Sequence, residues 1–372
     1  MKLSMKQNIG IIIGAFVFFS GIIQGVTPYT GEDQWGNILR DADQKNDQIV
    51  AIKLYEQVAG DIKAVPCARA YAKLQLGTRY FHGSHGLTQN DERARELYED
   101  AKDILDKTPQ KDTACLKNQA KVWLELGQIY CCGRGTSQNL GKARELFEKA
   151  AKQTHNLDAQ AVANLELAHD YYCYNCDVKK DLGKARELFE KVASQKANPS
   201  AQARALYSLA ELYSETKYKP DEIRRAFENA AAAAADSNDT FSQAEAWLGL
   251  GHFYWDGKLV PRDLGRAQEY FEKVTNQAVA SVVQVQAWVA LGEMYYERGD
   301  FSKALEFFNK VNEQQAFYVK AVTLARAFLG KMYSNGHGVA QDVQKALELL
   351  NQATQIKDNY TADPRARALA RF

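Results

Sequence analysis

The six cysteines and six histidines are the residues of this chain best suited to chemistry at a defined site. Cysteine thiolates form disulfides in oxidising compartments and also bind zinc, so their spacing is the first pattern to weigh. They all stand in the first half of the 372 residues, as Cys67, Cys115, Cys131, Cys132, Cys173 and Cys176. Disulfides, free thiols and a zinc site made by Cys131-Cys132 with Cys173-x-x-Cys176 stay open as alternatives. Zinc is disfavoured, because adjacent cysteines rarely both bind one tetrahedral ion well.

No group of residues has the spacing of a catalytic centre. The motifs G-x-S-x-G and H-E-x-x-H are absent, as is a phosphate-binding loop. His82, His85 and His337 stand in glycine-containing turns, HGSHG and NGHG, whose polarity accounts for them. The sequence therefore predicts no catalytic residue and no bound cofactor or metal.

The cysteines and histidines lie on a repeated unit whose clearest copy runs from Ala120 to Ala151. Trp123, Gly127 and Tyr130 are spaced i, i+4 and i+7, which places them on one face of a helix. A glycine inside a helix costs about 1 kcal/mol relative to alanine, so Gly127 predicts the close approach of a second helix. Asn139 is a good N-cap for that second helix. The second helix repeats the spacing with Ala143, Phe147 and Ala150.

Seven copies of this pair of helices follow one another in register. Successive spacings are 50, 41, 42, 41, 41 and 38 residues for the glycine position: Gly77, Gly127, Ala168, Ala210, Gly251, Gly292 and Gly330. A tyrosine follows each by three residues: Tyr80, Tyr130, Tyr171, Tyr213, Tyr254, Tyr295 and Tyr333. One helix pair cannot bury its apolar face alone, so we expect the copies to stack.

The pattern A-x-x-x-L-G-x-x-Y-x-x-G-x-G-x-x-x-(D/N)-x-x-K-A-x-x-x-F-x-x-A resembles the Sel-one-like repeat (SLR) family, a branch of the tetratricopeptide-type helical repeats. The resemblance covers roughly Asp47 to Thr354, and the fourth and sixth copies depart from it by their shorter loops. It implies an all-α fold: a right-handed α-solenoid of stacked antiparallel helix pairs, with about seven full repeats and degenerate terminal caps. It also implies a concave face that holds other proteins, and no conserved catalytic residue.

The repeat register groups the cysteines by position. Cys67 and Cys115 precede the first helices of neighbouring copies, and the other four follow the tyrosines of the second and third full copies. We expect Cys67 to pair with Cys115, and further pairs to be drawn from the remaining four. Bridged Cα atoms lie about 4.4–6.8 Å apart, closer than neighbouring helix axes, so pairing must use the helix ends. Cysteine-rich SLR proteins typically bridge the two helices within each repeat, but no second helix here carries a cysteine.

The chain divides into four segments. Residues 1–26 hold two lysines and then an apolar run, which is typical of a signal peptide or of an N-terminal membrane anchor. Residues 27–60 are a degenerate N-terminal repeat, residues 61–356 a helical repeat solenoid, and residues 357–372 a C-terminal capping helix. Lysines that flank an apolar segment stay in the cytoplasm. Under both interpretations of residues 1–26, the repeats are therefore exported. We expect a periplasmic or secreted protein, or one anchored to the membrane by residues 9–26.

Charge and one polar column indicate the kind of partner. Lysine plus arginine number 47 and aspartate plus glutamate 46, so no basic field favours nucleic acid. The residue after the glycine position is polar and changes from each copy to the next, as a recognition surface would: Gln128, His169, Glu211, His252, Glu293 and Lys331. A merely solvated helix face would look the same.

These observations predict a non-catalytic scaffold or adaptor of bacterial origin that binds another protein or peptide along its concave face. The membrane would be contacted only through the N-terminal segment. The alternative is a weak hydrolase acting on cell-wall or β-lactam-like substrates, because such activity has been ascribed to some cysteine-rich SLR proteins. A nucleophile and a base that converge in the concave groove would favour the hydrolase, and the sequence offers no such pair.

Overall fold

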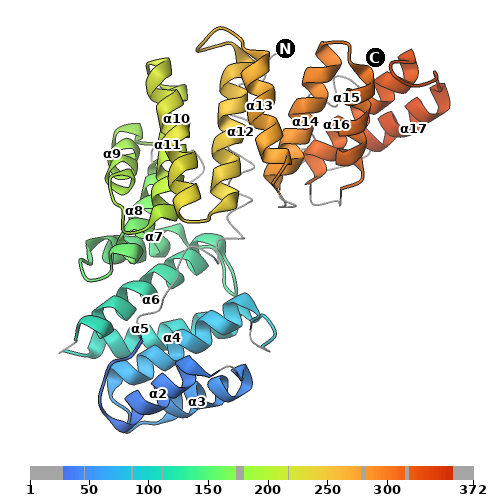
Figure 1. The fold of residues 1–372 in the computed structure, drawn as a ribbon. Helices are drawn as coiled ribbons and strands as arrows, with labels where there is room; N and C mark the ends of the chain where they lie inside the picture. Colours follow the sequence, from blue (N-terminus) through green and yellow to red (C-terminus); the bar gives the residue numbers. More distant parts are fainter. Residues whose placement is uncertain are drawn as a thin grey trace. The chain divides into compact units, whose positions relative to one another are not determined.

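The structure, a computed structural model, describes residues 28–45, 47–84, 87–109, 112–172, 180–216, 218–277, 282–314 and 318–354. Sixteen α-helices and no strands are found in these ranges (Figure 1). The segments expected to be a signal peptide or anchor (1–26) and a capping helix (357–372) lie outside the described residues.

The chain forms two compact units, and each is described by itself. Unit 1 ends at Ala205 and unit 2 begins at Leu206, so the division falls inside α10 (Pro199–Glu215). The other helices of unit 1 are α2 (Gln34–Gln44), α3 (Gln48–Gly60), α4 (Pro66–His82), α5 (Asp91–Lys107), α6 (Thr113–Cys132), α7 (Leu140–Lys152), α8 (Leu157–Tyr172) and α9 (Leu182–Ala193). Those of unit 2 are α11 (Pro220–Asp236), α12 (Thr240–Asp256), α13 (Leu264–Thr275), α14 (Val282–Glu297), α15 (Phe301–Asn312), α16 (Val319–Asn335) and α17 (Val343–Thr354).

Consecutive helices pack as pairs, and the pairs stack. In unit 1, α4 packs on α5, α6 on α7 and α8 on α9, while α5 and α7 also contact the first helix of the next copy. In unit 2 the pairs are α12–α13, α14–α15 and α16–α17. The all-α fold of stacked helix pairs that the repeat predicts is confirmed.

Side chains at the N-terminus of the second helices fix where these helices begin. The Asn139 side chain accepts a hydrogen bond from the backbone N–H of Lys142 (2.9 Å). Asp181 caps α9 in the same way. Such a cap satisfies an N–H that has no partner within the helix. The fourth copy instead has Lys219, which makes no capping hydrogen bond, and Pro220 in the first turn, where a missing N–H is tolerated.

Glycine lets the two helices of a pair come into contact. A Cβ added at Gly127 would lie 2.5 Å from Cε1 of Phe147, and one at Gly251 would lie 2.3 Å from Cε1 of Phe271. Carbon atoms in favourable contact are about 3.5–4.0 Å apart. The buried ring of the second helix therefore fills the space that a larger side chain on the first helix would need.

The glycine loop of the α6–α7 pair rests on the preceding pair. The Arg134 guanidinium donates hydrogen bonds to both carboxylate oxygens of Asp91 (3.0 and 2.6 Å) and lies 3.8 Å from the ring centroid of Phe81. A Cβ on Gly135 would lie 2.4 Å from the carbonyl carbon of Asp91. This loop therefore joins neighbouring copies as well as the two helices of its own copy.

The wider spacing of 50 residues between the first two copies comes from extra residues after Ala101, which lengthen two helices. α5 continues to Lys107 and has 17 residues, whereas α7 has 13. α6 begins at Thr113, with Asp112 as its N-cap, and has 20 residues. The insertion is therefore absorbed at the helix ends, and the stacking of the pairs continues.

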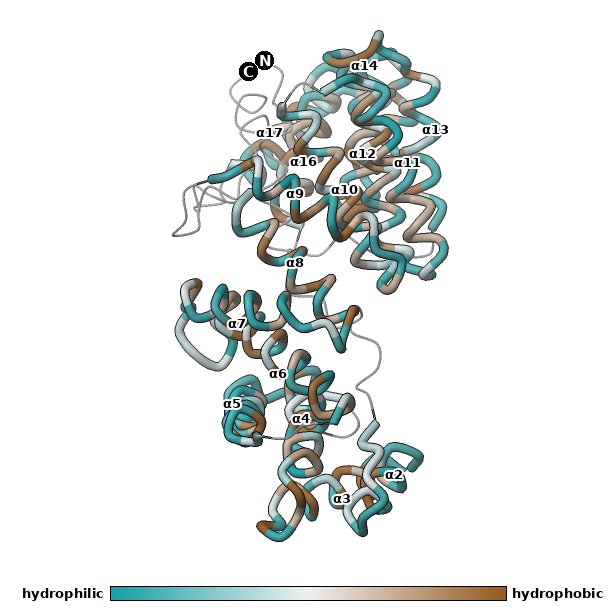
Figure 2. The backbone as a smooth tube through the Cα atoms, turned by 90° about the vertical axis from the view of Figure 1, so that its left-hand side faces the viewer, coloured by the Kyte–Doolittle hydropathy of each residue, from teal (hydrophilic) through white to brown (hydrophobic). Residues whose placement is uncertain are grey.

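The second helices, such as α7 and α13, have one buried and one exposed face, as expected for helices packed on one side. First helices such as α6 and α8 have almost no exposed residue between their ends. In Figure 2 each labelled helix carries both hydrophobic and hydrophilic residues. None of the described helices is both long and apolar enough to cross a membrane.

Candidate functional site

The residues that follow the glycine position form a polar column, and the geometry of the first helices explains where their side chains point. The residue before the glycine position is a buried leucine in the six copies that carry the column: Leu126, Leu167, Leu209, Leu250, Leu291 and Leu329. Residues on either side of the glycine position are about 200° apart around the helix. Because the leucine points into the core, the polar residue points away from it. All six polar residues are half-buried: Gln128, His169, Glu211, His252, Glu293 and Lys331.

In unit 1 the column contributes Gln128 on α6 and His169 on α8. The His169 ring lies edge-on to the Phe189 ring, with centroids 5.1 Å apart. Burial, with a smaller contribution from the charge of Arg204, lowers the pKa of His169 to about 3. His169 is therefore neutral at physiological pH and presents a hydrogen-bonding imidazole without a charge.

In unit 2 the column begins with Glu211 on α10. The Tyr207 hydroxyl donates a hydrogen bond to the Glu211 carboxylate (3.1 Å). Burial raises the pKa of Glu211 to about 7; the Tyr207 hydrogen bond opposes this shift, and the charge of Glu215 adds to it. Near neutral pH, Glu211 therefore exists both as a protonated acid, which donates a hydrogen bond, and as a carboxylate, which only accepts.

The column continues over α12, α14 and α16, which are neighbours in unit 2. His252 stacks on the ring of Trp255, with centroids 5.7 Å apart. The Nζ atom of Lys331 lies 5.6 Å from the ring centroid of Tyr296. Together with Glu293 on α14, successive helices thus present an imidazole, a carboxylate and an ammonium group.

Sequence reasoning missed a second set of charged residues, which is buried in unit 1. Lys121 and Glu125 on α6 and Glu166 on α8 are each less than a tenth exposed. Burial lowers the pKa of Lys121 and raises the pKa of both glutamates. The register held a signal for the two glutamates, because the positions in unit 2 that correspond to them are small or apolar: Ser208, Gly249, Ala290 and Phe328.

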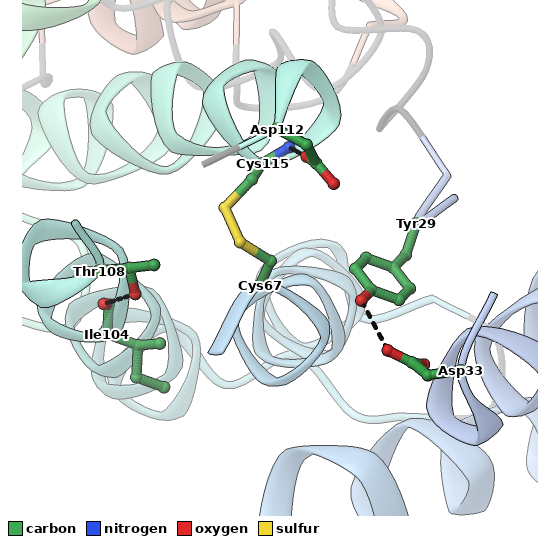
Figure 3. Close-up of a disulfide and its surroundings, with 7 residues drawn as sticks. All are labelled: Tyr29, Asp33, Cys67, Ile104, Thr108, Asp112 and Cys115. Carbon is green, nitrogen blue, oxygen red and sulfur yellow. Dashed lines mark hydrogen bonds between the residues drawn. A yellow bond between two sulfur atoms is a disulfide. The ribbon is translucent and has the colours of Figure 1, made fainter. Parts of the chain in front are cut away.

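A disulfide joins Cys67 at the start of α4 to Cys115 near the start of α6 (Figure 3). The two Cα atoms are 5.5 Å apart, within the range that a disulfide spans. The carboxylate of Asp112 accepts a hydrogen bond from the Cys115 N–H (2.6 Å), which fixes the start of α6 beside the bridge. The first helices of two neighbouring copies are therefore linked at their N-terminal ends, through the pair of cysteines that the sequence groups together.

Two further cysteines lie at the C-terminal end of α6. Cys131 is a half-buried free thiol and Cys132 an exposed one, at the end of α6. Cys173 and Cys176 lie outside the described residues, so further pairing stays a prediction. Within the part of the chain that the structure describes, no three His, Cys, Asp or Glu side chains are placed to hold a metal ion.

Two of the loop histidines pack against aromatic rings. His82 lies edge-on to Phe81, with centroids 5.1 Å apart, and burial lowers its pKa. His337 stacks on Phe301, with centroids 4.2 Å apart. His85 lies outside the described residues. The contacts of His82 and His337 are those of packing residues.

Comparison with protein families gives repeated matches along the chain. The family profile described as Sel1 repeat matches residues 70–103, 124–155, 161–196, 242–277, 286–318 and 323–356, which together make up more than half of the chain. A search of curated proteins finds no match.

Solved structures of helical-repeat proteins are similar to this one. A Sel1 repeat protein from Oxalobacter formigenes aligns over 94% of this chain and 97% of its own, with 20% sequence identity and a TM-score of 0.52. A protective antigen with an SLR fold from uropathogenic Escherichia coli aligns over 86% of this chain and 74% of its own, with 18% identity and a TM-score of 0.42. The first of these likenesses supports the helical-repeat fold.

Proposed function

Because the chain belongs to the Sel1 repeat family, we propose that it is a non-catalytic scaffold that binds another protein or peptide along its first helices. Sel1 repeat proteins are generally protein-interaction scaffolds. One observation carries the proposal for this chain: the residue after the glycine position is half-buried and polar, and its side chain changes from each copy to the next. The leucine column beside it is buried and uniform.

The spacing of the helices suggests how a partner would be recognised. Neighbouring helices lie about 8–10 Å apart, and an extended peptide advances about 3.3 Å per residue. A peptide laid across the first helices would therefore bring about every third residue to a column position. Each copy would add one polar contact, and the order of those contacts would set specificity.

Unit 2 favours a partner of mixed charge. Glu293 on α14 is suited to a basic side chain of the partner, and Lys331 on α16 to an acidic one. Trp255 beside His252 and Tyr296 beside Lys331 add apolar surface next to the column. We expect these aromatic residues to provide much of the affinity and the charges to fix the register.

Site-specific photo-crosslinking in the full chain tests the proposal. The reactive amino acid is placed at His252 or Lys331, and for comparison at Glu269, which is exposed on the second helix α13. We expect saturable cross-linking to one partner at the two column positions and little cross-linking at position 269. Equal capture at all three positions would contradict it, as would turnover of wall fragments or β-lactams by the purified protein.

Charge reversal with the captured partner provides a quantitative test. Glu293→Lys should weaken the dissociation constant about tenfold or more, which corresponds to roughly 1.4 kcal/mol. Glu269→Lys makes the same change of charge outside the column and should leave the affinity unchanged. If the two variants bind alike, the column is not the binding surface.

We also propose that the repeats act outside the bacterial cytoplasm, in the periplasm or secreted, or anchored through residues 9–26. The Cys67–Cys115 disulfide supports this location, because such bonds persist in oxidising compartments. The mass of the protein from cells quenched with an alkylating reagent should show these two cysteines unalkylated. A fused reporter enzyme active only outside the cytoplasm should also be active. Alkylation of both cysteines together with an inactive reporter would overturn the proposal.

A further inference from the structure

The short connection between α11 and α12 contains an exposed asparagine, Asn238. Its φ of 53° makes it the one residue other than glycine with a positive φ in the part of the chain that the structure describes. Glycine usually holds such a position after a helix, as Gly133 does after α6 and Gly257 after α12. The chain thus places a side chain at a turn where the backbone alone would favour glycine.

The backbone of Asn238 completes the end of α11, but its side chain takes no part. The N–H groups of Asn238 and Asp239 donate hydrogen bonds to the carbonyl oxygens of Ala235 (3.1 Å) and Ala234 (2.9 Å). This is the Schellman arrangement that closes many helices. Among the described residues, the Asn238 side-chain amide has no hydrogen-bond partner, whereas the side-chain oxygen of Asn139 caps a helix. Asn238 therefore offers a free carboxamide at the surface.

The residues around Asn238 match a modification motif. Asn238-Asp239-Thr240 fits N-x-[ST] with a middle residue other than proline, the acceptor sequence for N-linked glycosylation. Asp236, Asn238 and Thr240 are exposed, while the residues between them are half-buried. Within the described ranges the Thr240 hydroxyl makes no hydrogen bond, so it is available to an enzyme that reads the motif. A second match, Asn359-Tyr360-Thr361, lies outside the described residues.

We propose that Asn238 is an N-glycosylation site, at which an oligosaccharyltransferase attaches an oligosaccharide to the side-chain nitrogen Nδ2. The donor is an oligosaccharide linked through pyrophosphate to a membrane lipid. Nδ2 attacks C1 of the first sugar, so the N–C1 bond forms and the C1–O bond to the pyrophosphate breaks. The lipid pyrophosphate leaves with the bonding electrons, and the amide loses one proton to a base of the transferase. This inference rests on the proposed location outside the cytoplasm, because such sites are modified in exported chains.

A glycan at this position is compatible with the fold and with partner binding. The Asp239 carboxylate caps α12 by accepting hydrogen bonds from the N–H (3.0 Å) and the hydroxyl (2.8 Å) of Ser242, without the Asn238 side chain. The connection lies at the N-terminal end of α12, whereas His252 of the polar column lies near the other end. At 1.5 Å per residue, about 18 Å of helix separates Thr240 from His252. The attached sugar therefore leaves the column open.

Mass spectrometry of the full chain tests the modification. The chain is produced in bacteria that hold an N-oligosaccharyltransferase and its lipid-linked oligosaccharide, with an exported acceptor protein that shows the enzyme to be active. We expect one glycan on the peptide that contains Asn238, and an amidase that removes N-linked glycans should leave aspartate there. An unmodified Asn238 with an active export reporter would overturn this inference alone. An unmodified Asn238 with an inactive reporter would overturn the proposed location as well.

Variants of the motif separate recognition from folding. Asn238→Gly should fold as the original chain does, because glycine suits the positive φ, and should lose this glycan completely. Thr240→Ala should lower the glycosylated fraction at least tenfold, whereas Thr240→Ser keeps the hydroxyl and should retain the glycan. Full glycosylation of Thr240→Ala would overturn the inference.

Asn198 provides a matched control for exposure. It stands in Asn198-Pro199-Ser200, where the proline blocks the motif. Asn198 is only 7% exposed, and its side-chain oxygen accepts a hydrogen bond from the N–H of Ala201 (2.8 Å). Pro199→Ala completes the motif but should leave Asn198 unmodified. Equal modification of Asn198 and Asn238 in this variant would show that the fold does not select the site, and would overturn the inference.

Discussion

The first helices of unit 1 bury charged side chains, whereas those of unit 2 bury apolar and small ones. Among the residues that the structure describes, all four buried charged side chains belong to unit 1: Lys121, Glu125, Glu166 and Arg204. Unit 1 also holds the disulfide, and no cysteine occurs after Cys176. The same repeat thus encloses two differently composed cores.

The position two residues before the glycine shows the difference most directly. In unit 2 this position includes Gly249, where an added Cβ would lie 2.4 Å from Cε1 of Phe227. A ring of the preceding pair fills that space. In unit 1 the position is Glu125, whose burial raises its pKa. Burying a carboxylate opposes folding, so unit 1 depends more on its other stabilising contacts.

The disulfide is the contact that can offset the stability lost by burying these charges. It closes a long loop between Cys67 and Cys115, and such links typically stabilise a fold by about 2–4 kcal/mol. Both units bury aromatic rings almost fully, such as Tyr98 and Phe189 in unit 1 and Phe271 and Phe308 in unit 2. The comparison teaches that the repeat specifies the backbone and the aromatic core, while the buried charges and the disulfide that can offset them are features of unit 1.

The largest expected effect comes from the aromatic core of unit 2. Phe271→Ala removes a ring with 0% exposure and should lower the free energy of unfolding by about 3–5 kcal/mol. Urea denaturation measures the loss, and hydrogen exchange of α12 and α13 locates it. Tyr270→Ala, a half-buried neighbour on the same helix, should lose less. Equal acceleration of exchange in unit 1 would show that the two units do not differ as described.

The next effect comes from the disulfide of unit 1. Replacing Cys67 and Cys115 together by serine should lower the free energy of unfolding by about 2–4 kcal/mol, with faster exchange in α4 and α6. A reducing agent added to the original chain should have the same effect. Cys132→Ser is the control, since this thiol is exposed and free. If the double variant is as stable as the original chain, the disulfide does not offset the cost of the buried charges.

The polar column gives the two units opposite responses to pH. The pKa of His169 is lowered to about 3, so the unfolded chain binds more protons and unit 1 gains stability as pH rises from 3 to 6.5. The pKa of Glu211 is raised to about 7, so the folded chain binds more protons and unit 2 loses stability as pH rises from 4.5 to 7. Each effect should be on the order of a few kcal/mol, because one pKa unit corresponds to about 1.4 kcal/mol.

Denaturation of His169→Gln and Glu211→Gln across this pH range checks both signs. Each variant should flatten the pH dependence of the stability of its own unit, measured by hydrogen exchange of α8 for His169→Gln and of α12 for Glu211→Gln. The stability of the other unit should be unchanged. Slopes of the same sign in both units would contradict the assigned protonation states.

The smallest expected effect concerns one buried charge. Glu125→Gln should raise the stability of unit 1 by about 1 kcal/mol at pH 7, because it removes a carboxylate from a buried position. The raised pKa of Glu125 means that the advantage of the variant grows as pH rises above the ordinary pKa of glutamate. Glu145→Gln, at an exposed ion pair with Lys149, should change stability by only a few tenths of a kcal/mol. Loss of stability in Glu125→Gln would show that the carboxylate makes a favourable contact.

The repeat register predicted the helices because it rests on side chains that recur in each copy. Gly127 marks the close approach to Phe147, and Asn139 caps the second helix, as found. The burial of Lys121 could not be predicted in this way, because charged residues on helices are usually solvated and only the neighbouring copies cover this one. The raised pKa of Glu211 likewise depends on its surroundings in three dimensions. The division inside α10 leaves no trace in the sequence, since the register continues through it.

The link between Cys67 and Cys115 also changes how the chain responds to force. Pulling on the two ends cannot straighten the residues between the bridged cysteines, which are 48 positions apart and include all of α5. Fully extended residues span about 3.3–3.6 Å each, so the oxidised chain should reach a contour length about 160–170 Å shorter than the reduced chain. In a protein tethered at one end and loaded by a bound partner at the other, this ring would stay closed while the rest of the chain extends.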